Sequence, residues 1–319
     1  MSIRNFLIAL LGLVSIPFAT AAPGSGQDCG RPLAPSISFV QFQSPNLAAP
    51  SSPLTIKGKL SVPSGTSSGQ CAPANGKWPA VLILHGSSGV DSRGDFYEQA
   101  LNAAGIATLQ IDMWEARGVT GIANRPQAPV LTYPDAFSAL RFLASHPNIV
   151  ADRIAVLGFS WGGVVSLAAA EQLYANTFGG GRRFRAHVAN YPVCYGANNV
   201  PIPALFPPAE KGTQFLNLTG APVLIQIGSN DDYDNGTAPC RALANSVNPT
   251  NNNVVQVIEY PGGYHAWDRL MIPVVAPDPF GNLGSFFATG QIPLVRIVPD
   301  VQLALASRER VVKFFSRHL

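Results

Sequence analysis

The sequence has few charged residues: they make up 12% of its 319 residues, whereas hydrophobic residues make up 47%. This balance excludes a disordered or solvating polymer, which is poor in hydrophobic residues and rich in charge. Lys and Arg form no long block and the net charge is only +3, so the sequence lacks the basic footprint of a nucleic-acid-binding protein. We therefore expect a chain that packs a large core and has no nucleic-acid partner.

Cofactor motifs and long apolar runs are also missing. His, Cys and carboxylate residues show no metal-ligand spacing, and no Gly-rich turn has the dinucleotide-binding pattern, so we expect neither a metal nor another cofactor. The uncharged stretch 154–170 could be mistaken for a membrane span, but Gly158, Ser160 and two further glycines interrupt it. It fits a buried strand, a sharp turn and a buried helix, so no stable membrane insertion is expected.

Residues 1–21 have the features of a signal peptide. One positive charge at Arg4 is followed by an apolar run at 6–16 that is too short to span a bilayer, and the run Ala-Thr-Ala ending at Ala21 has the small-x-small pattern of a cleavage site. We expect cleavage there and export to the periplasm or the medium. The mature chain, 22–319, has no repeat or interior linker, so a single domain is expected, and its oligomeric state is left open.

Apolar runs typical of strands alternate with segments of helical periodicity along the mature chain. Strands are predicted at 55–62, 80–84, 106–111, 154–157, 186–190, 223–227 and 254–259, and helices at 96–104, 135–144, 164–174 and 301–315. Strands that alternate with helices form right-handed crossovers and a mostly parallel sheet with helices on both faces. The sequence therefore predicts the α/β class.

The segment 158–163, Gly-Phe-Ser-Trp-Gly-Gly, has the G-x-S-x-G pattern and lies between a predicted strand and a predicted helix. In a nucleophile elbow the Ser occupies a sharp turn, so its neighbours two positions away must be nearly free of side chain. Ser160 is therefore the predicted nucleophile, with a plain Gly turn as the alternative. The backbone N–H of Trp161, at the start of the helix, is the predicted first donor to an oxyanion.

A Ser nucleophile needs a His base, which a carboxylate must orient. Three of the five His residues lie where a surface or core role is expected: His146, His187 and His318. His265 follows the predicted strand 254–259, at the carboxyl end of a strand, where α/β sites form. His265 is therefore the predicted base, and a solvated loop His is the alternative.

Three acids follow the predicted strand 223–227: Asp231, Asp232 and Asp234. Asp231, in G-x-x-D spacing, is the predicted orienting acid, and Asp232 is the alternative. The resulting chain order of Ser, Asp and His is the order of an α/β-hydrolase triad.

A second oxyanion donor is expected in the loop after the predicted strand 80–84. A turn there would direct backbone N–H groups inward, and Ser87 is the predicted donor, with Ser88 as the alternative. His85 is expected to pack beneath this turn as a structural residue.

Five segments share a common resemblance: 84–97, 111–118, 152–163, 222–232 and 260–268. Together they resemble the dienelactone hydrolase family of α/β-hydrolases. The resemblance implies an α/β-hydrolase fold and an enzyme that cleaves small-molecule esters or lactones through an acyl-enzyme on Ser160, with His265 and Asp231 completing the triad. The chain departs from the family in two ways: Ser160 stands where dienelactone hydrolases have Cys, and the oxyanion loop has Ser and Gly where they carry Glu.

The four cysteines form no C-x-x-C motif, and an exported chain folds in a compartment where thiols pair. Spacing alone allows three pairings. In the implied fold, Cys194 and Cys240 follow the carboxyl ends of neighbouring strands, which favours a bridge between them and leaves Cys29 to pair with Cys71.

The segment between Tyr191 and Pro222 is rich in Pro and Gly and does not fit a full cap domain, so a relatively open site is expected. Trp161, Tyr191 and Trp267 are the candidate aromatic neighbours of the substrate pocket, although aromatic residues near an elbow are as often core. The segment 272–299 has no clear periodicity and is a candidate for the rim.

Two other functions would use the same features. An acyltransferase or a peptidase would use the same triad, and a non-catalytic binding protein would use the same fold. The presence of Ser, Asp and His in the triad positions favours catalysis over binding alone.

Overall fold

A computed structural model describes residues 33–64, 76–121, 124–198 and 217–319. The predicted signal peptide, Cys29, Cys71 and residues 199–216 of the segment in which no cap is expected lie outside the described residues.

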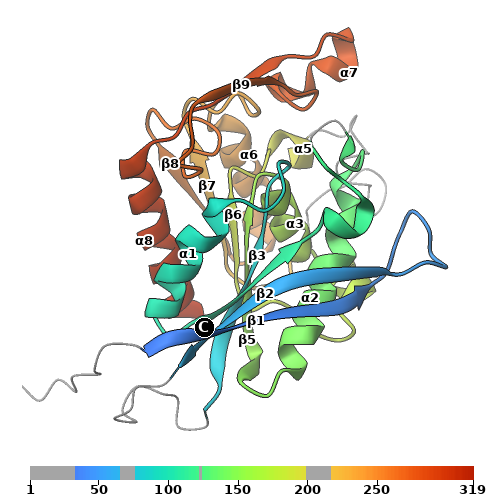
Figure 1. Cartoon of the computed structure of the whole chain (residues 1–319). Helices are drawn as coiled ribbons and strands as arrows, with labels where there is room; N and C mark the ends of the chain where they lie inside the picture. Colours follow the sequence, from blue (N-terminus) through green and yellow to red (C-terminus); the bar gives the residue numbers. More distant parts are fainter. Residues whose placement is uncertain (1–32, 65–75, 122–123, 199–216) are drawn as a thin grey trace, which may run out of the picture.

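An eight-stranded sheet forms the centre of the protein, in the order β1-β2-β4-β3-β5-β6-β7-β8 (Figure 1). Its strands are β1 (Leu33–Ser44), β2 (Leu54–Ser64), β3 (Trp78–Leu84), β4 (Ala107–Asp112), β5 (Ile149–Phe159), β6 (His187–Asn190), β7 (Val223–Gly228) and β8 (Val255–Tyr260). β1 pairs antiparallel with β2, and β2 with β4, whereas the remaining pairs are parallel. The predicted α/β class with a mostly parallel sheet is confirmed.

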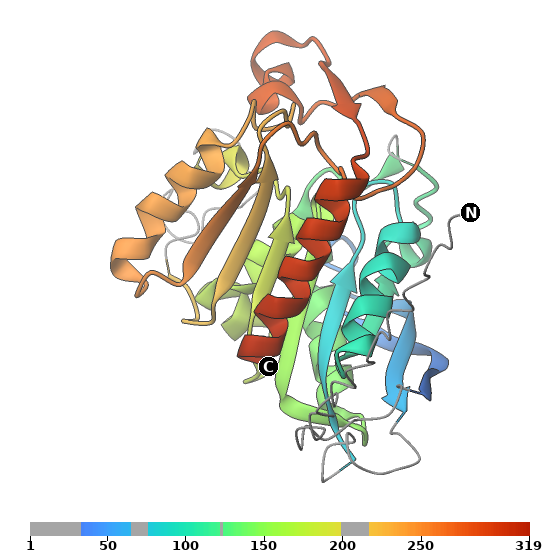
Figure 2. The same ribbon diagram turned by 90° about the vertical axis from the view of Figure 1, so that its left-hand side faces the viewer.

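Helices cover both faces of this sheet. The longer ones are α1 (Ser92–Ala103), α2 (Tyr133–Ser145), α3 (Trp161–Ala169), α4 (Gln172–Phe178), α6 (Ala238–Val247) and α8 (Val301–His318). α1 packs against α8 on one face, and α2 packs against α3 on the other (Figures 1 and 2). Across the described ranges, no helix combines the length and apolar character needed to cross a bilayer.

Short helical turns connect these elements. They are α5 (Tyr195–Asn198), α7 (Phe286–Thr289) and the 3₁₀ turns Glu115–Arg117, Pro129–Thr132, Asn248–Thr250 and Asn282–Gly284.

The parallel strands are apolar because both of their faces are covered. All seven residues of β3 are buried, as expected of a strand with helices on either side. Since parallel strands point the same way, the loops that follow β3, β5, β7 and β8 all lie at the carboxyl ends of the strands, on one side of the sheet. Ser87, Ser160, Asp231, His265 and Trp267 lie in these loops, whereas Trp161 begins the helix after β5 and Tyr191 follows β6.

The predicted helix 164–174 is wrong in one respect, because the structure divides it in two. α3 ends at Ala169 and α4 begins at Gln172. The side chain of Glu171 accepts a hydrogen bond from the backbone N–H of Leu173 and so caps the start of α4. Side chains that cap a helix stabilise a new start, which is why the helical pattern does not continue as one helix.

The segment 272–299 has more structure than its lack of periodicity indicated. β9 (Val274–Pro277) and β10 (Leu294–Ile297) form a separate antiparallel pair that carries α7 at its far end. We call the segment 272–299 the excursion, and Figure 1 shows that it extends away from the end of the sheet. Ile297 forms a β-bridge with His265, so the excursion returns to the body beside the predicted base.

Candidate active site

Ser160 lies at a sharp turn between β5 and α3. Its backbone has φ 50° and ψ −109°, a conformation that a residue other than Gly adopts only at a cost and that is concentrated at functional sites. A Cβ on Gly158 would lie 1.9 Å from the carbonyl oxygen of Gly162, and a Cβ on Gly162 would lie 2.3 Å from that of Leu84. The two glycines therefore allow the strand, the turn and the helix to approach.

Gly158→Ala is expected to lower the free energy of unfolding by about 3 kcal/mol and to displace Ser160, because the added methyl group meets backbone atoms that cannot move aside. Denaturant unfolding together with an ester-hydrolysis assay measures both effects. Gly121→Ala is the matched control, since a Cβ there meets no atom within 4 Å. Equal stability of the two variants would contradict the role given to Gly158.

The side chains of Ser160, His265 and Asp231 form one chain of hydrogen bonds. His265 Nε2 lies 2.9 Å from Ser160 Oγ, and His265 Nδ1 lies 2.8 Å from Asp231 Oδ2. All three residues are buried, with exposed fractions of 8% or less. In this arrangement Nδ1 donates to the carboxylate, which leaves Nε2 free to accept the proton of the Ser hydroxyl.

The acids beside Asp231 have other partners. Asp232 forms an ion pair of 2.6 Å with Arg296 near the surface. Asp234 is buried and accepts hydrogen bonds from the backbone N–H groups of Cys194, at 2.8 Å, and Tyr195, at 2.7 Å. Burial, together with the charge of Asp231, raises the pKa of Asp234 to about 8. The acid that contacts His265 is therefore Asp231 and not the alternative Asp232.

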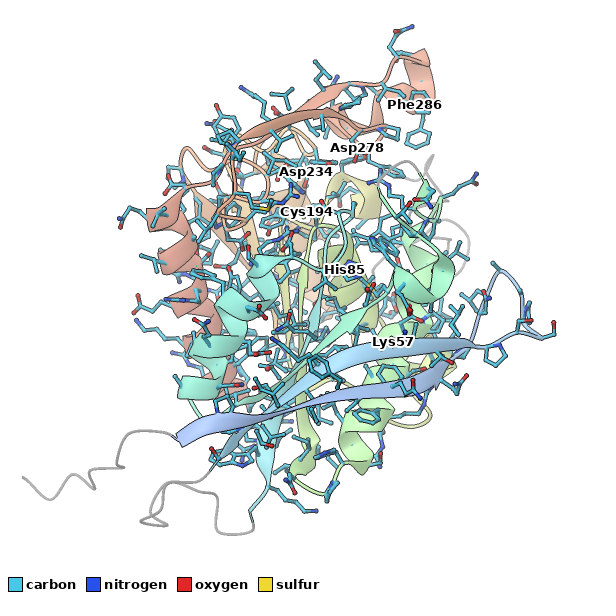
Figure 3. The ribbon with its side chains drawn as sticks, in the orientation of Figure 1. Lys57, His85, Cys194, Asp234, Asp278 and Phe286 are labelled. Atoms are coloured by element: carbon cyan, nitrogen blue, oxygen red, sulfur yellow. A yellow bond between two sulfur atoms is a disulfide. The ribbon has the colours of Figure 1, made fainter. Side chains whose placement is uncertain are left out.

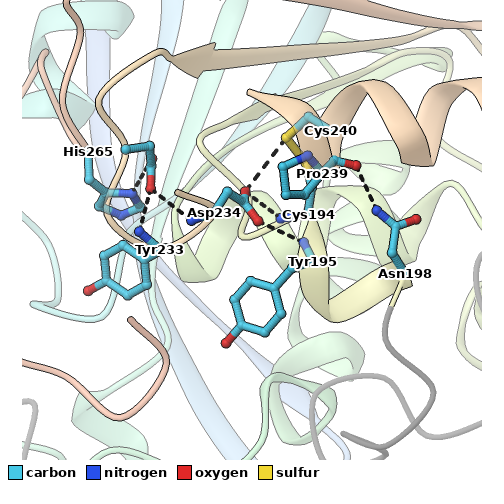
Figure 4. The surroundings of a disulfide bond; sticks show 9 residues. Cys194, Tyr195, Asn198, Tyr233, Asp234, Pro239, Cys240 and His265 are labelled. Atoms are coloured by element: carbon cyan, nitrogen blue, oxygen red, sulfur yellow. Dashed lines mark hydrogen bonds and ion pairs between the residues drawn. A yellow bond between two sulfur atoms is a disulfide. The ribbon is translucent and has the colours of Figure 1, made fainter. Parts of the chain in front are cut away.

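Cys194 and Cys240 form a disulfide, with their Cα atoms 5.0 Å apart (Figure 4). This confirms the predicted pairing of these two residues, and the pairing of Cys29 with Cys71 lies outside the described residues. Asp234 lies beside the bridge, with Oδ2 3.7 Å from Cys240 Sγ. These three side chains also make up a cluster that could hold a metal, but both sulfur atoms are used in the disulfide.

Replacing both bridged cysteines, as Cys194→Ser with Cys240→Ser, is expected to lower the free energy of unfolding by about 4 kcal/mol, because the bridge closes a loop of 46 residues. The loop holding Asp231 should loosen too, so activity should fall at temperatures well below the unfolding midpoint. Thermal unfolding and ester hydrolysis measured in parallel test both effects. A double variant with unchanged stability would show that the bridge does not brace this loop.

The loop after β3 lies directly against Ser160. A Cβ on Gly86 would lie 3.5 Å from Ser160 Cβ. His85 holds this loop from below: its Nε2 accepts from the backbone N–H of Met113 at 2.9 Å, and its Nδ1 donates to the Gly86 carbonyl at 2.8 Å. Burial lowers the pKa of His85, which favours the neutral ring that these two bonds require. Ser87 lies in this loop, and its carbonyl accepts a hydrogen bond of 3.1 Å from the indole of Trp114.

The backbone N–H of Trp161 is the first amide of α3. The first amides of a helix have no acceptor within the helix and carry its positive partial charge. The Trp161 N–H follows Ser160 directly, so it is placed to donate to an oxygen held near Ser160 Oγ. The Trp161 side chain is buried and donates to Thr132 Oγ1 at 3.0 Å.

The prediction that Tyr191 and Trp267 line the substrate pocket is wrong, because both have an exposed fraction of 0%. The hydroxyl of Tyr191 donates to the buried carboxylate of Asp268, and the indole of Trp267 donates to Ser307. A buried Tyr or Trp needs a partner for its polar atom, and here both partners lie inside the protein. The two aromatic residues support the site from within and do not form its wall.

Buried ionic residues around the site were missed by the sequence reasoning. Arg93 pairs with Asp91 and donates to Tyr191, and Arg125 pairs with Asp278. Arg125 and Asp278 come from segments with no active-site motif, and Arg93 lies in segment 84–97 but was not singled out there. Charged residues are mostly exposed, so only their burial in the folded protein distinguishes these from surface charges.

The chain is similar to one protein family and to a curated relative. The model of the dienelactone hydrolase family matches residues 69–270. The chain is 24% identical over 169 residues to the probable 2-oxo-3-(5-oxofuran-2-ylidene)propanoate lactonase of a Bradyrhizobium species, a match that covers 50% of this chain and 61% of the lactonase. The chain thus spans less than two thirds of that relative.

Several solved structures share the fold, and two of them follow. One is a dienelactone hydrolase-like promiscuous phosphotriesterase from metagenomic libraries, with a TM-score of 0.54 and 16% identity over 88% of this chain and 98% of that one. The other is esterase 2 of Thermogutta terrifontis, phosphorylated by paraoxon, with a TM-score of 0.56 and 12% identity over 86% of this chain and 92% of that one. At these identities the likeness shows the common fold.

Proposed function

Because the chain belongs to the dienelactone hydrolase family, a family of ester-bond hydrolases, we propose that it cleaves carboxylic esters or lactones through a triad of Ser160, His265 and Asp231. The observation that carries this proposal is the unbroken hydrogen-bond chain from Ser160 Oγ through the imidazole to Asp231. It lies at a strained elbow between β5 and α3, where the hydroxyl of Ser160 is held 2.9 Å from the imidazole of His265.

In the first half of the reaction, Ser160 Oγ attacks the carbonyl carbon of the ester while its proton moves to His265 Nε2. The imidazolium that forms is stabilised by Asp231, which stays ionised. The carbonyl oxygen becomes an oxyanion, and the backbone N–H of Trp161 donates to it. The backbone N–H of Ser87 is the proposed second donor, since its loop lies against Ser160 at Gly86.

In the second half, the tetrahedral intermediate collapses and the alcohol leaves with the proton from His265, which gives an acyl-enzyme on Ser160. A water molecule then transfers a proton to His265 Nε2 and attacks the acyl carbon, which gives a second tetrahedral intermediate. His265 returns that proton to Ser160 Oγ as the bond from the acyl carbon to Oγ breaks, so the carboxylic acid leaves and the resting enzyme is restored. With a lactone, the released hydroxyl stays on the acyl chain, so this water must compete with ring closure.

Export is a second part of the proposal. Two observations support it: residues 1–21 have the pattern of a cleaved signal peptide, and the Cys194–Cys240 disulfide is of a kind that persists in oxidising compartments. Mass spectrometry of protein from the periplasm and the medium should find a mature N-terminus at residue 22. Protein found only in the cytosol with residues 1–21 intact would contradict this part alone.

A substrate survey tests the reaction class. A chain-length series of p-nitrophenyl esters, assayed beside lactones and a peptide amide, should give turnover of esters or lactones and none of the amide. Mass spectrometry of enzyme quenched during turnover should find the acyl group on the peptide that contains Ser160. Preferential transfer to an added alcohol would identify an acyltransferase, and preferential amide cleavage would identify a peptidase.

A further inference from the structure

Two tyrosines contact the imidazole of His265. The ring centroid of Tyr191 lies 4.7 Å from that of His265, and the ring centroid of Tyr233 lies 4.2 Å from it. Tyr191 directly follows β6, and Tyr233 lies two residues after Asp231. Both tyrosines are buried, with exposed fractions of 0% and 7%, so neither ring can turn away into solvent.

The hydroxyl of Tyr191 is held by ionic side chains. It donates to Asp268 Oδ1, and it accepts a hydrogen bond of 3.2 Å from the guanidinium of Arg93. Asp268 also accepts from the hydroxyl of Tyr97 at 2.7 Å, and Arg93 is paired with Asp91 at 2.6 Å. Arg93 and Asp268 are 2% and 1% exposed, so these groups hold the ring of Tyr191 from a buried position.

The hydroxyl of Tyr233 is held in the same way by a second, separate pair. It donates to Asp278 Oδ2 at 3.0 Å, and Asp278 forms two hydrogen bonds of 3.0 Å and 2.8 Å with the guanidinium of Arg125. Both members of this ion pair are buried. Asp278 follows β9 on the excursion, below Phe286 in Figure 3, so the excursion is tied to the ring beside His265.

Burying these charges needs a reason other than stability. A buried ion pair loses most of its Coulombic gain to desolvation, and an apolar replacement of similar shape is often as stable. Here each of two buried Asp–Arg groups contacts the hydroxyl of a tyrosine that contacts His265. An imidazole that must keep one hydrogen bond to Asp231 and another to Ser160 has to be held within a narrow range of angles.

We infer that Tyr191 and Tyr233 are positioning residues for His265, and that Asp268 with Arg93 and Asp278 with Arg125 fix their rings through the hydroxyls. The two tyrosines form a clamp that keeps the imidazole aligned on Ser160 and Asp231 at once. This inference deepens the proposed function and rests on it for the kinetic part of its test.

Tyr191→Phe and Tyr233→Phe keep the ring and remove only the tether, so they test the clamp directly. Each is expected to lower kcat on the order of tenfold with KM nearly unchanged, because a loosened base misplaces the transferred proton and not the substrate. Tyr97→Phe is the matched control. It removes a buried hydroxyl from the same Asp268, but the ring of Tyr97 packs on Phe96 and Phe159 and makes no ring contact with His265 in the described structure.

The second readout needs no substrate. The proton between His265 Nδ1 and Asp231 should give a low-field resonance in the proton NMR spectrum of the resting enzyme. This resonance should broaden in Tyr191→Phe and Tyr233→Phe and stay sharp in Tyr97→Phe. Thermal unfolding of all three variants shows whether they lose similar stability.

The outcomes separate this inference from the proposed function. An unchanged kcat and resonance in Tyr191→Phe and Tyr233→Phe would overturn the clamp, as would an equal fall of kcat in all three variants. If the wild type hydrolyses no ester but its resonance broadens in the two clamp variants alone, the clamp stands and the proposed reaction fails.

Discussion

Ser160→Ala is expected to lower kcat for ester hydrolysis by about 10⁴-fold or more, without unfolding the protein. Ser160 Oγ is hydrogen-bonded to His265 Nε2, and the substitution removes only this oxygen atom while it keeps Cβ in place, so it removes the nucleophile and little else. The remaining oxyanion donors and binding contacts should leave weak catalysis above the rate in water. Initial rates with the best p-nitrophenyl ester, together with a thermal unfolding curve, measure both effects.

The matched control for this variant is Ser166→Ala, which lies further along α3, the helix that follows Ser160. Ser166 is fully buried, and its Oγ has no hydrogen-bond partner among the described residues. The same chemical change there should leave kcat close to that of the wild type. A folded Ser160→Ala variant that keeps most of its activity would show that the nucleophile lies elsewhere.

Asp231→Asn is expected to lower kcat by about 10⁴-fold, the loss that follows when a triad His is held in the wrong tautomer. Asp231 Oδ1 accepts from the backbone N–H of Tyr233 at 2.8 Å, so the oxygen of the new amide keeps that bond and its NH₂ group faces His265 Nδ1. Nδ1 must then accept, and the ring proton moves to Nε2. With Nε2 protonated, the imidazole cannot take the proton of Ser160.

Asp232→Asn provides the comparison one residue away. Its ion pair with Arg296 lies near the surface, where half of the Arg296 side chain is exposed. Such pairs contribute about 0 to 1 kcal/mol to stability, so a small change in stability and little change in kcat are expected. If kcat fell strongly in Asp232→Asn and little in Asp231→Asn, the orienting acid would be reassigned to Asp232.

Some features of the protein follow from short stretches of sequence. The alternation of apolar runs and helical patterns predicts the parallel sheet, because strands buried on both faces need continuous apolar residues such as those of β3. The elbow at Ser160 is predicted because Gly158 and Gly162 must lie within two residues of the turn. These signals are local, since they depend on how neighbouring residues shape the backbone.

Other features depend on residues far apart in the sequence, and only the tertiary structure decides them. Asp231 and Asp232 are adjacent acids on one loop, and the choice between them is made by where His265 and Arg296 lie. Tyr191 is an aromatic residue near the elbow, and its burial depends on α1 and on the loop of Asp268.

The structure of the excursion also could not be predicted from local sequence. The segment 272–299 has few charges and no period, so nothing local predicts that β9 and β10 pair or that Asp278 pairs with Arg125, which lies 153 residues earlier. Sequence patterns determined the fold class and the residue types of the site, because backbone propensity and apolar periodicity act over a few residues. Tertiary structure decided which polar side chains are buried and what they contact, because that depends on the packing of distant segments.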